Sequence, residues 1–318
     1  MTAEEKIRRR MMEKNKSKIF TNPIIVAIGA LLCCALWGSA TPFIKVGYEL
    51  ILPEKNTAST MLFAGIRFTL AGMLTVLIYS LARKKLLYPK KENIKRVATV
   101  SCFQTVIQYI FFYIGLANTS GVKGTILSGS SAFFALLIAS LIFHQEKLTF
   151  KKIFACIIGF LGIVFVNLNG LDFTMNFTGD CFVLFSSISS AASAVLVKRY
   201  SAFEDAVVIS GYQFIMGGIV MMIVGAVFGG AVAFMSLSAV LVIIYLAFLS
   251  AVAYALWGVL LKHNPVSKVT IFSFMTPVFG VILSNIMLSE QSNVSPINLL
   301  ITLILVSTGI IMLNHKKE

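Results

Sequence analysis

The chain has 318 residues, of which 58% are hydrophobic and only 13% are charged, and its mean hydropathy is +0.88. A water-soluble fold cannot hide this much apolar surface, so the composition excludes soluble proteins and predicts a membrane protein. The formal net charge of +14 requires no nucleic-acid partner, because the basic residues lie in short segments suited to anionic lipid head groups.

Ten apolar runs follow one another along the chain. Each is close to the roughly 20 residues that a helix needs to cross about 30 Å of hydrocarbon. The runs are apolar all round and do not alternate, so they predict an all-α membrane protein with ten transmembrane helices. They lie at 23–46, 58–82, 97–117, 123–143, 153–169, 179–199, 206–229, 237–261, 268–288 and 296–314.

A basic arm, residues 1–22, precedes the first run. We interpret it as a retained cytoplasmic tail and not as a signal peptide, because the run after it is long and nine more follow. This places most other Lys and Arg residues on the same face, in 83–96, 147–152, 198–199, 262–268 and the C-terminus. The positive-inside rule therefore predicts a multi-pass protein of the cell membrane with both termini in the cytoplasm.

An internal repeat runs through the apolar segments. AGIRFTLAG at 64–72 returns as SGYQFIMGG at 210–218. A second set reappears 145 positions later, from Tyr109, Leu116, Lys123, Thr125, Ile126 and Ser128 to Tyr254, Leu261, Lys268, Thr270, Ile271 and Ser273. Five runs in each half make the halves, 23–169 and 170–318, enter the membrane with opposite polarity. Two inverted five-helix repeats are typical of secondary transporters that work by alternating access.

Several motifs resemble the EamA branch of the drug/metabolite transporter superfamily. They are LLCCALWGSATPFIKVG in the first run, AGIRFTLAGMLT in the second, and YALWGVLLKHNPVSKVTIFSFMTPVFGVILSNIMLSE across the eighth and ninth. The resemblance covers nearly the whole chain and is specific for the family, though not for a substrate. It implies a ten-helix carrier, and many such carriers export amino acids or related metabolites.

Arg67 is a charged residue inside the second run. A charge there costs about 2.5–3.5 kcal/mol on insertion scales, and no acidic residue lies deep in any run. One interpretation is an anion or carboxylate contact, since a guanidinium binds two carboxylate oxygens at once. The other, which we favour, is structural: the side chain reaches outward or caps helix carbonyls, and its repeat partner, Gln213, is uncharged.

Polar and aromatic residues at membrane depth are the candidates for solute contact. Trp37 and Trp257 are the only tryptophans, and both lie well inside their runs. Ser101, Gln104 and Gln108 are spaced to share one helical face. Packing roles are the open alternative, above all for small hydroxyl residues. The predicted substrate-binding set is Trp37, Gln104, Gln108, Tyr109, Ser128, Tyr254, Trp257 and Ser273.

Other polar residues receive structural interpretations. Lys45, Lys123, Lys198 and Lys268 lie at run ends and are expected to mark the membrane boundary, with a gating pair from Lys45 to Glu49 or Glu54 as the alternative. Glu146 and Glu290 are expected to cap helix N-termini, with proton coupling as the alternative. Pro42 and Pro277 are expected to kink their helices and are possible hinges. Asn285 is a candidate for solute contact or for an interhelical hydrogen bond.

Enzyme signatures are missing from the sequence. The three His residues and five Cys residues show no metal-ligand spacing, and no Gly-rich phosphate loop occurs. We therefore predict a secondary carrier of small metabolites, most simply amino acids, which is not an enzyme and has no cofactor, metal or nucleic-acid partner. The alternatives are an exporter of lipophilic or cationic drugs and a non-transporting membrane sensor or scaffold. A coupling proton or other ion and a homodimer are both compatible with the sequence.

Overall fold

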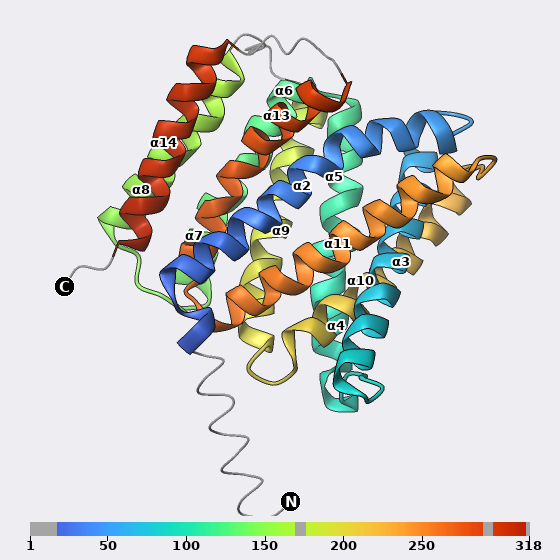
Figure 1. The fold of residues 1–318 in the computed structure, drawn as a ribbon, viewed down its shortest axis with the longest axis horizontal. Coiled ribbons are helices and arrows are strands. Elements are labelled where there is room, and N and C mark those ends of the chain that lie inside the picture. Colours follow the sequence, from blue (N-terminus) through green and yellow to red (C-terminus); the bar gives the residue numbers. More distant parts are fainter. Residues whose placement is uncertain (1–17, 169–175, 289–294, 316–318) are drawn as a thin grey trace, which may run out of the picture.

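The computed structural model describes residues 18–168, 176–288 and 295–315 (Figure 1). The described chain is helical, and nine of its helices are long and apolar enough to cross a membrane. A further apolar helix, α8 (Phe150–Val166), has 17 residues. The protein is therefore an all-α membrane protein, as the composition predicts. The basic arm before residue 18 and Glu290 lie outside the described residues, as does the side chain of Asn285.

The helices follow the predicted runs to within a few residues. In the first half they are α2 (Pro23–Ile51), α3 (Thr57–Arg83), α4 (Ile94–Ser101), α5 (Gln108–Ala117), α6 (Gly121–Gly129), α7 (Ser131–Leu137) and α8. In the second half they are α9 (Phe177–Tyr200), α10 (Ala206–Val227), α11 (Leu237–His263), α12 (Val266–Thr270), α13 (Met275–Leu288) and α14 (Pro296–Asn314). Side chains that favour N-caps set several starts, because their oxygens accept the free amides of the first turn. Examples are Asn56, Asn176, Asp205 and Ser236.

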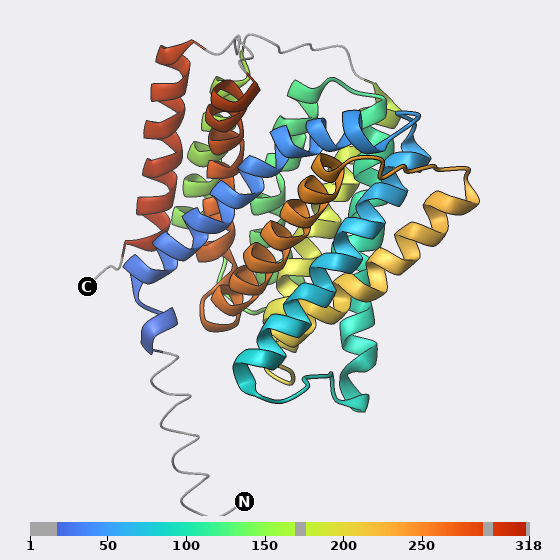
Figure 2. The ribbon, with the colours of Figure 1, turned by 45° about the vertical axis from the view of Figure 1, so that its right-hand side comes forward.

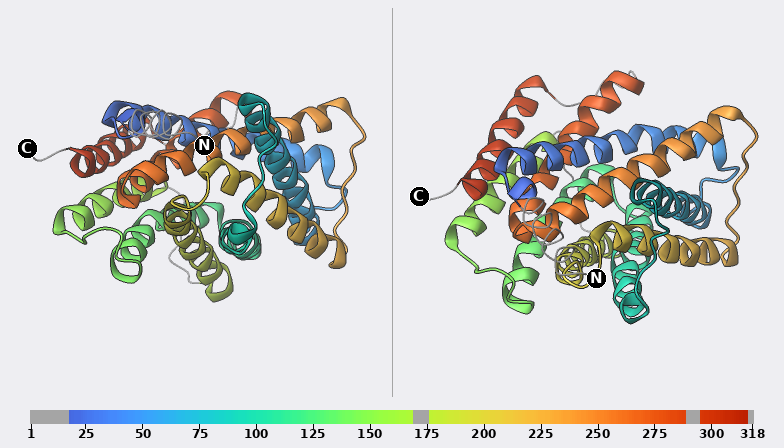
Figure 3. Two further views of the ribbon diagram at one scale, coloured as in Figure 1. Left: turned by 90° about the horizontal axis from the view of Figure 1, so that it is seen from below. Right: turned by 60° about the horizontal axis from the view of Figure 1, so that its bottom comes forward.

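Helices of the two halves pair with each other throughout the bundle. The most extensive contacts join α3 to α10, α8 to α14, α2 to α11 and α13, and α5 to α9 (Figures 1 and 2). Viewed along the bundle, early and late segments of the chain are interleaved (Figure 3). Neither half packs as a separate body, so any space at the centre is walled by both.

The two copies of the 64–72 and 210–218 echo lie against each other in the α3–α10 pair. A Cβ atom on Gly65 would lie 2.8 Å from the Gly218 carbonyl oxygen, and one on Gly72 would lie 2.5 Å from the Gly211 carbonyl oxygen. Between these contacts the equivalent rings of Phe68 and Phe214 stack, 5.0 Å apart and 4° from parallel. Only glycine permits such close backbones, which is how helices associate tightly in lipid.

Three spans depart from regular α-helix. A π-helical segment, η2 (Cys102–Ile107), joins α4 to α5, and another, η3 (Ile138–Ile142), follows α7. A 3₁₀ turn, η5 (Ile271–Phe274), separates α12 from α13. It lies directly before Pro277, whose missing amide leaves a carbonyl in the preceding turn without its partner. The ninth span is therefore broken where a kink was expected, whereas α2 runs through Pro42 without interruption.

Candidate functional site

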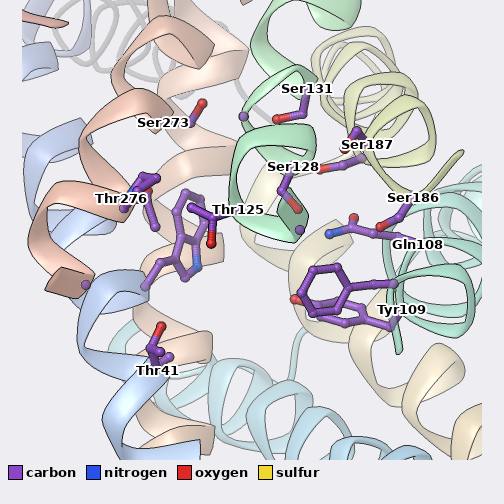
Figure 4. A pocket seen from close by; sticks show the side chains of 18 of the residues that line it. Thr41, Gln108, Tyr109, Thr125, Ser128, Ser131, Ser186, Ser187, Ser273 and Thr276 are labelled. Atoms are coloured by element: carbon purple, nitrogen blue, oxygen red, sulfur yellow. The ribbon is translucent and has the colours of Figure 1, made fainter. Parts of the chain in front are cut away.

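A cavity of about 950 Å³ lies at the centre of the bundle. Its walls come from α2, α3, η2, α5, α6, α7, α9, α11, α12, η5 and α13, so both halves contribute. Figure 4 shows hydroxyl, amide and aromatic side chains from these helices around it. The size suits a small metabolite or a drug-sized molecule.

The structure gathers the predicted substrate-binding residues on this one cavity. All eight line it, although they come from six separate helical segments. Arg67 and Pro277 line it as well, and Pro42 does not. What each residue contacts during function stays a prediction.

Aromatic side chains form a continuous group across the cavity. The rings of Trp37 and Trp257 meet edge to face at 4.9 Å, and Trp37 meets Tyr254 at 5.1 Å. The hydroxyls of Tyr254 and Tyr109 are 2.9 Å apart. These two tyrosines are the equivalent residues of the sequence repeat, 145 positions apart. The indole Nε1 of Trp37 is buried without a hydrogen-bond partner in the described structure, so it can donate to a solute.

Gln104 and Gln108 face the cavity from η2 and from the start of α5. The side-chain oxygen of Gln108 is buried and lacks a hydrogen-bond partner among the described residues, which leaves it able to accept from a solute. Ser101, expected on the same face, instead donates to the Gln213 carbonyl oxygen on α10. The reason is the π-helical segment between them, whose wider turns rotate the residues after it relative to those before it.

Hydroxyl side chains line another wall of the cavity, and of these only Ser128 belongs to the predicted substrate-binding set. Thr125, Ser128 and Ser131 follow one another at intervals of three along α6 and α7, and Ser186 and Ser187 face them from α9 (Figure 4). The three-residue spacing of Thr125, Ser128 and Ser131 in the sequence could have indicated that these hydroxyls share one helical face. Ser187 also donates to the Leu127 carbonyl oxygen at 3.0 Å, so this hydroxyl has a packing role too.

Arg67 is buried on the cavity wall, with 4% of its surface exposed. Its guanidinium lies over the Phe68 ring, 4.4 Å from the centroid, and its Nε has no hydrogen-bond partner within the described residues. The two structural roles considered for it are not what the geometry shows. The side chain does not reach outward to solvent, and none of the described hydrogen bonds joins it to a helix carbonyl.

Lysines at helix ends differ in their contacts. Lys123 forms an ion pair with Asp180 on α9 at 3.0 Å, and both side chains are largely buried. The expectation that Lys123 only marks a boundary was therefore incomplete, because the lysine joins α6 to α9. Lys198 donates to the Lys262 carbonyl oxygen at 3.0 Å. Lys45 lines the cavity, whereas Glu49 pairs with Lys55.

The cavity reaches one end of the bundle. Lining residues include Lys45 near the end of α2, Gly121 at the start of α6, Asn167 after α8 and Ser284 near the end of α13. These positions share the end away from the N-terminus, at the top of Figure 1. We call the other end, where α3 ends at Arg83 and the lysine-rich loop to α4 begins, the basic end.

The basic end is sealed by packing and by a buried carboxylate. Val195, Leu260, Val269 and Ile271 are almost completely buried there. Glu146 accepts hydrogen bonds from the backbone amide of Ser267 at 2.9 Å and from its hydroxyl, and it pairs with Lys152. Glu146 does cap a helix N-terminus, as expected, but the helix is the distant α12 and not the next one along the chain.

The direction of opening gives a first prediction. In a variant without Cys102 and Cys181, the two cysteines that are not buried, we expect Ser284→Cys to react with a membrane-impermeant maleimide added at the end opposite the basic end. Val269→Cys, completely buried at the sealed end, should not react from either side. If Val269→Cys reacted from the basic side as fast as Ser284→Cys reacts from the opposite side, the seal would be contradicted.

Comparison with known proteins decides the family. Residues 24–168 and 177–314 each match the model of the EamA-like transporter family. The chain belongs to the EamA-like transporter family. The two matches together cover most of the chain, which confirms the resemblance seen in its motifs.

Curated relatives of this EamA-type chain are also transporters by name. It is 24% identical over 265 residues to an uncharacterized transporter of Archaeoglobus fulgidus, covering 81% of this chain and 88% of the relative. It is 24% identical over 266 residues to the uncharacterized transporter YdfC of Bacillus subtilis, covering 83% and 84%. One crystal structure of a protein superposes with a TM-score of 0.72 at 14% identity, covering 90% of this chain and 97% of the other. The superposition supports the fold, and the family match identifies a membrane transporter.

Proposed function

We propose that this EamA-type transporter is a secondary active carrier that exports small metabolites, in the first place amino acids or related compounds, by alternating access. The observation that carries the proposal is the central cavity, which is walled by both halves of the chain, reaches one end of the bundle and is sealed at the other. A carrier needs two such states, with the seal at opposite ends.

Exchange of equivalent contacts supports an inverted repeat. The contact of Gly65 with Gly218 becomes the contact of Gly211 with Gly72 when each residue is replaced by its repeat partner. Phe68 and Phe214 are partners of each other, as are Tyr109 and Tyr254. Contacts that map onto themselves are what a two-fold axis between α3 and α10 produces. The proposed repeats are 23–169 and 170–318, with five helices each.

The same symmetry supplies the second state. In the described state the seal closes the basic end. Exchanging the conformations of the two halves would open that end and close the other, because each half would take the packing of its partner. With the basic end in the cytoplasm of the cell, as the positive-inside rule favours, the described state is open outward.

The lining favours amino acids over lipophilic cations. Aromatic faces, amides and hydroxyls dominate it, and no Asp or Glu occurs among the lining residues that the structure describes. A site for cationic drugs would be expected to hold a carboxylate, since an unpaired cation is costly at membrane depth. Free donors and acceptors at Trp37 and Gln108 suit a small polar solute.

A metabolite screen in cells tests the proposal. Intracellular and medium pools are compared with and without expression, and then with Gln108→Ala and Trp37→Phe. Expression should lower the intracellular pool of the exported solute and raise its pool in the medium. Each variant should export about tenfold less, because a hydrogen bond to a buried polar group is worth about 1–3 kcal/mol.

Phe150→Ala is the matched control, since Phe150 is 81% exposed on α8 and lies away from the cavity. All variants are compared at equal amounts in the membrane. Export by Gln108→Ala and Trp37→Phe at the rate of Phe150→Ala would contradict a solute path through this cavity. Turnover of a lipid without movement of any solute would contradict the carrier itself.

A further inference from the structure

The strongest unexplained group in the cavity is the guanidinium of Arg67. Arg67 lines the cavity, and only 4% of its surface is exposed. No acidic side chain pairs with it among the described residues. Its Nε has no hydrogen-bond partner there. A cation held in this way at membrane depth is stabilised poorly by the protein alone.

The neighbours of Arg67 supply dipoles and a ring face but no negative charge. The Phe68 ring lies under the guanidinium at 4.4 Å. The hydroxyls of Tyr48, Tyr109 and Tyr113 lie within its electrostatic reach. These groups orient the guanidinium and reduce the cost of its burial. They leave its charge uncompensated, so the cavity favours an anionic group at this wall.

The chemistry of the vacant contacts identifies the anion. A guanidinium presents parallel N–H donors that match the two oxygens of a carboxylate. On the same lining, the Gln108 oxygen is a buried acceptor without a partner, and the Trp37 indole offers a ring face. Both can hold an ammonium group. The lining therefore has separate places for the two ends of a zwitterion.

We infer that Arg67 is the carboxylate-binding residue of the cavity and that the carried solute bears a carboxylate. The second part rests on the proposed carrier function, whereas the first concerns binding alone. Arg67 is then the residue that separates amino acids and other organic acids from amines of the same shape.

Intrinsic fluorescence gives a direct binding assay. The chain has two tryptophans, and both line the cavity, so a bound solute alters their emission. The purified protein in detergent is titrated with three matched sets built on alanine, leucine and phenylalanine. Each set contains the amino acid, its amide and the amine without the carboxyl group. Inorganic phosphate and methanesulfonate are the other anions tested.

We expect at least one amino acid to bind about tenfold or more tightly than its own amide and amine, because a charged hydrogen-bond pair is lost in both analogues. Arg67→Gln, which installs the residue of the repeat partner Gln213, should remove that preference. Arg67→Lys should retain part of this preference, since a lysine keeps the positive charge but lacks the two parallel N–H donors of a guanidinium. Arg83→Gln is the control, because Arg83 lies on the same helix at the exposed basic end.

Four results would overturn the inference: amides that bind as tightly as their acids in all three sets, no binding by any carboxylate, binding of phosphate or sulfonate alone, or an unchanged preference in folded Arg67→Gln protein. Monodisperse elution establishes folding, and Arg67→Lys provides the test if Arg67→Gln is not folded. Carboxylate binding without flux in liposomes would contradict the carrier and leave the binding site in place. Flux of amino acids unaffected by Arg67→Gln would contradict the site and leave the carrier in place.

Discussion

Replacement of Gly218 by leucine should remove most of the folded protein from the membrane. A Cβ at this position would lie 2.4 Å from the Thr69 hydroxyl oxygen and 2.6 Å from the Thr69 backbone nitrogen. Backbone cannot rotate aside as a side chain can, so α3 and α10 would have to separate. Overpacking usually costs about 1–3 kcal/mol, and a whole isobutyl group against backbone should exceed that range. The yield of monodisperse protein and its loss on heating measure the effect.

Gly121→Ala is the control for this substitution. Nothing lies within 4 Å of the position that its Cβ would take, and Gly121 is the first residue of α6. Its yield and thermal stability should match those of the natural chain. A Gly218→Leu protein as stable as Gly121→Ala would contradict the close crossing of the two repeat copies.

Loss of Glu146 should open the basic end. Glu146→Ala removes the acceptor for the Ser267 amide and hydroxyl and the partner of Lys152, and the Glu146 side chain is 5% exposed. Hydrogen bonds to a charged group contribute about 1.5–3 kcal/mol each. A loss of about 3 kcal/mol would shift the balance between closed and open ends by roughly 100-fold. Ala194→Cys on the cavity lining, in the variant without Cys102 and Cys181, should then react with a reagent added at the basic side.

Glu49→Ala is the matched control for a carboxylate in an ion pair. Glu49 and Lys55 pair at the opposite end with side chains 68% and 55% exposed, and such pairs contribute little. Labelling at Ala194→Cys should not change in this control. An unchanged labelling rate in Glu146→Ala would show that the seal does not depend on the buried carboxylate.

The length and the uniformly apolar character of the runs were sufficient to predict the helices, because burial of backbone polar groups in lipid leaves few alternatives. The run at 58–82 became α3 (Thr57–Arg83), and the run at 206–229 became α10 (Ala206–Val227). Interruptions of the helix within a span were harder to predict. Pro277 signalled one of them, but η2 contains neither Pro nor Gly, so nothing in its local sequence indicated the turn that separates Ser101 from the cavity.

The comparison of repeat copies favoured a structural interpretation of Arg67. Gln213 matches it in sequence, yet Gln213 is completely buried between helices and accepts a hydrogen bond from Thr105 at 2.7 Å. The two positions therefore occupy different environments. Equivalent positions in the sequence repeat need not have equivalent surroundings, so the lack of charge at Gln213 does not show that Arg67 is structural.

Contacts between distant segments could not be predicted from the sequence. Glu146 meets Ser267 across 121 positions, and Lys123 meets Asp180 across 57. Both acids were visible as charges near run ends, but no local pattern indicates which helix lies opposite. These pairings depend on how the two halves interleave, which the order of the runs does not determine.

Flux in proteoliposomes is the most direct test of the carrier. Purified protein is reconstituted, loaded with the solute found in the cell screen, and compared with Gln108→Ala and with empty liposomes. We expect saturable efflux that an opposing pool of the same solute accelerates, with about a tenfold loss in Gln108→Ala. Efflux that does not saturate, or an identical rate in Gln108→Ala, would contradict transport by alternating access through this cavity.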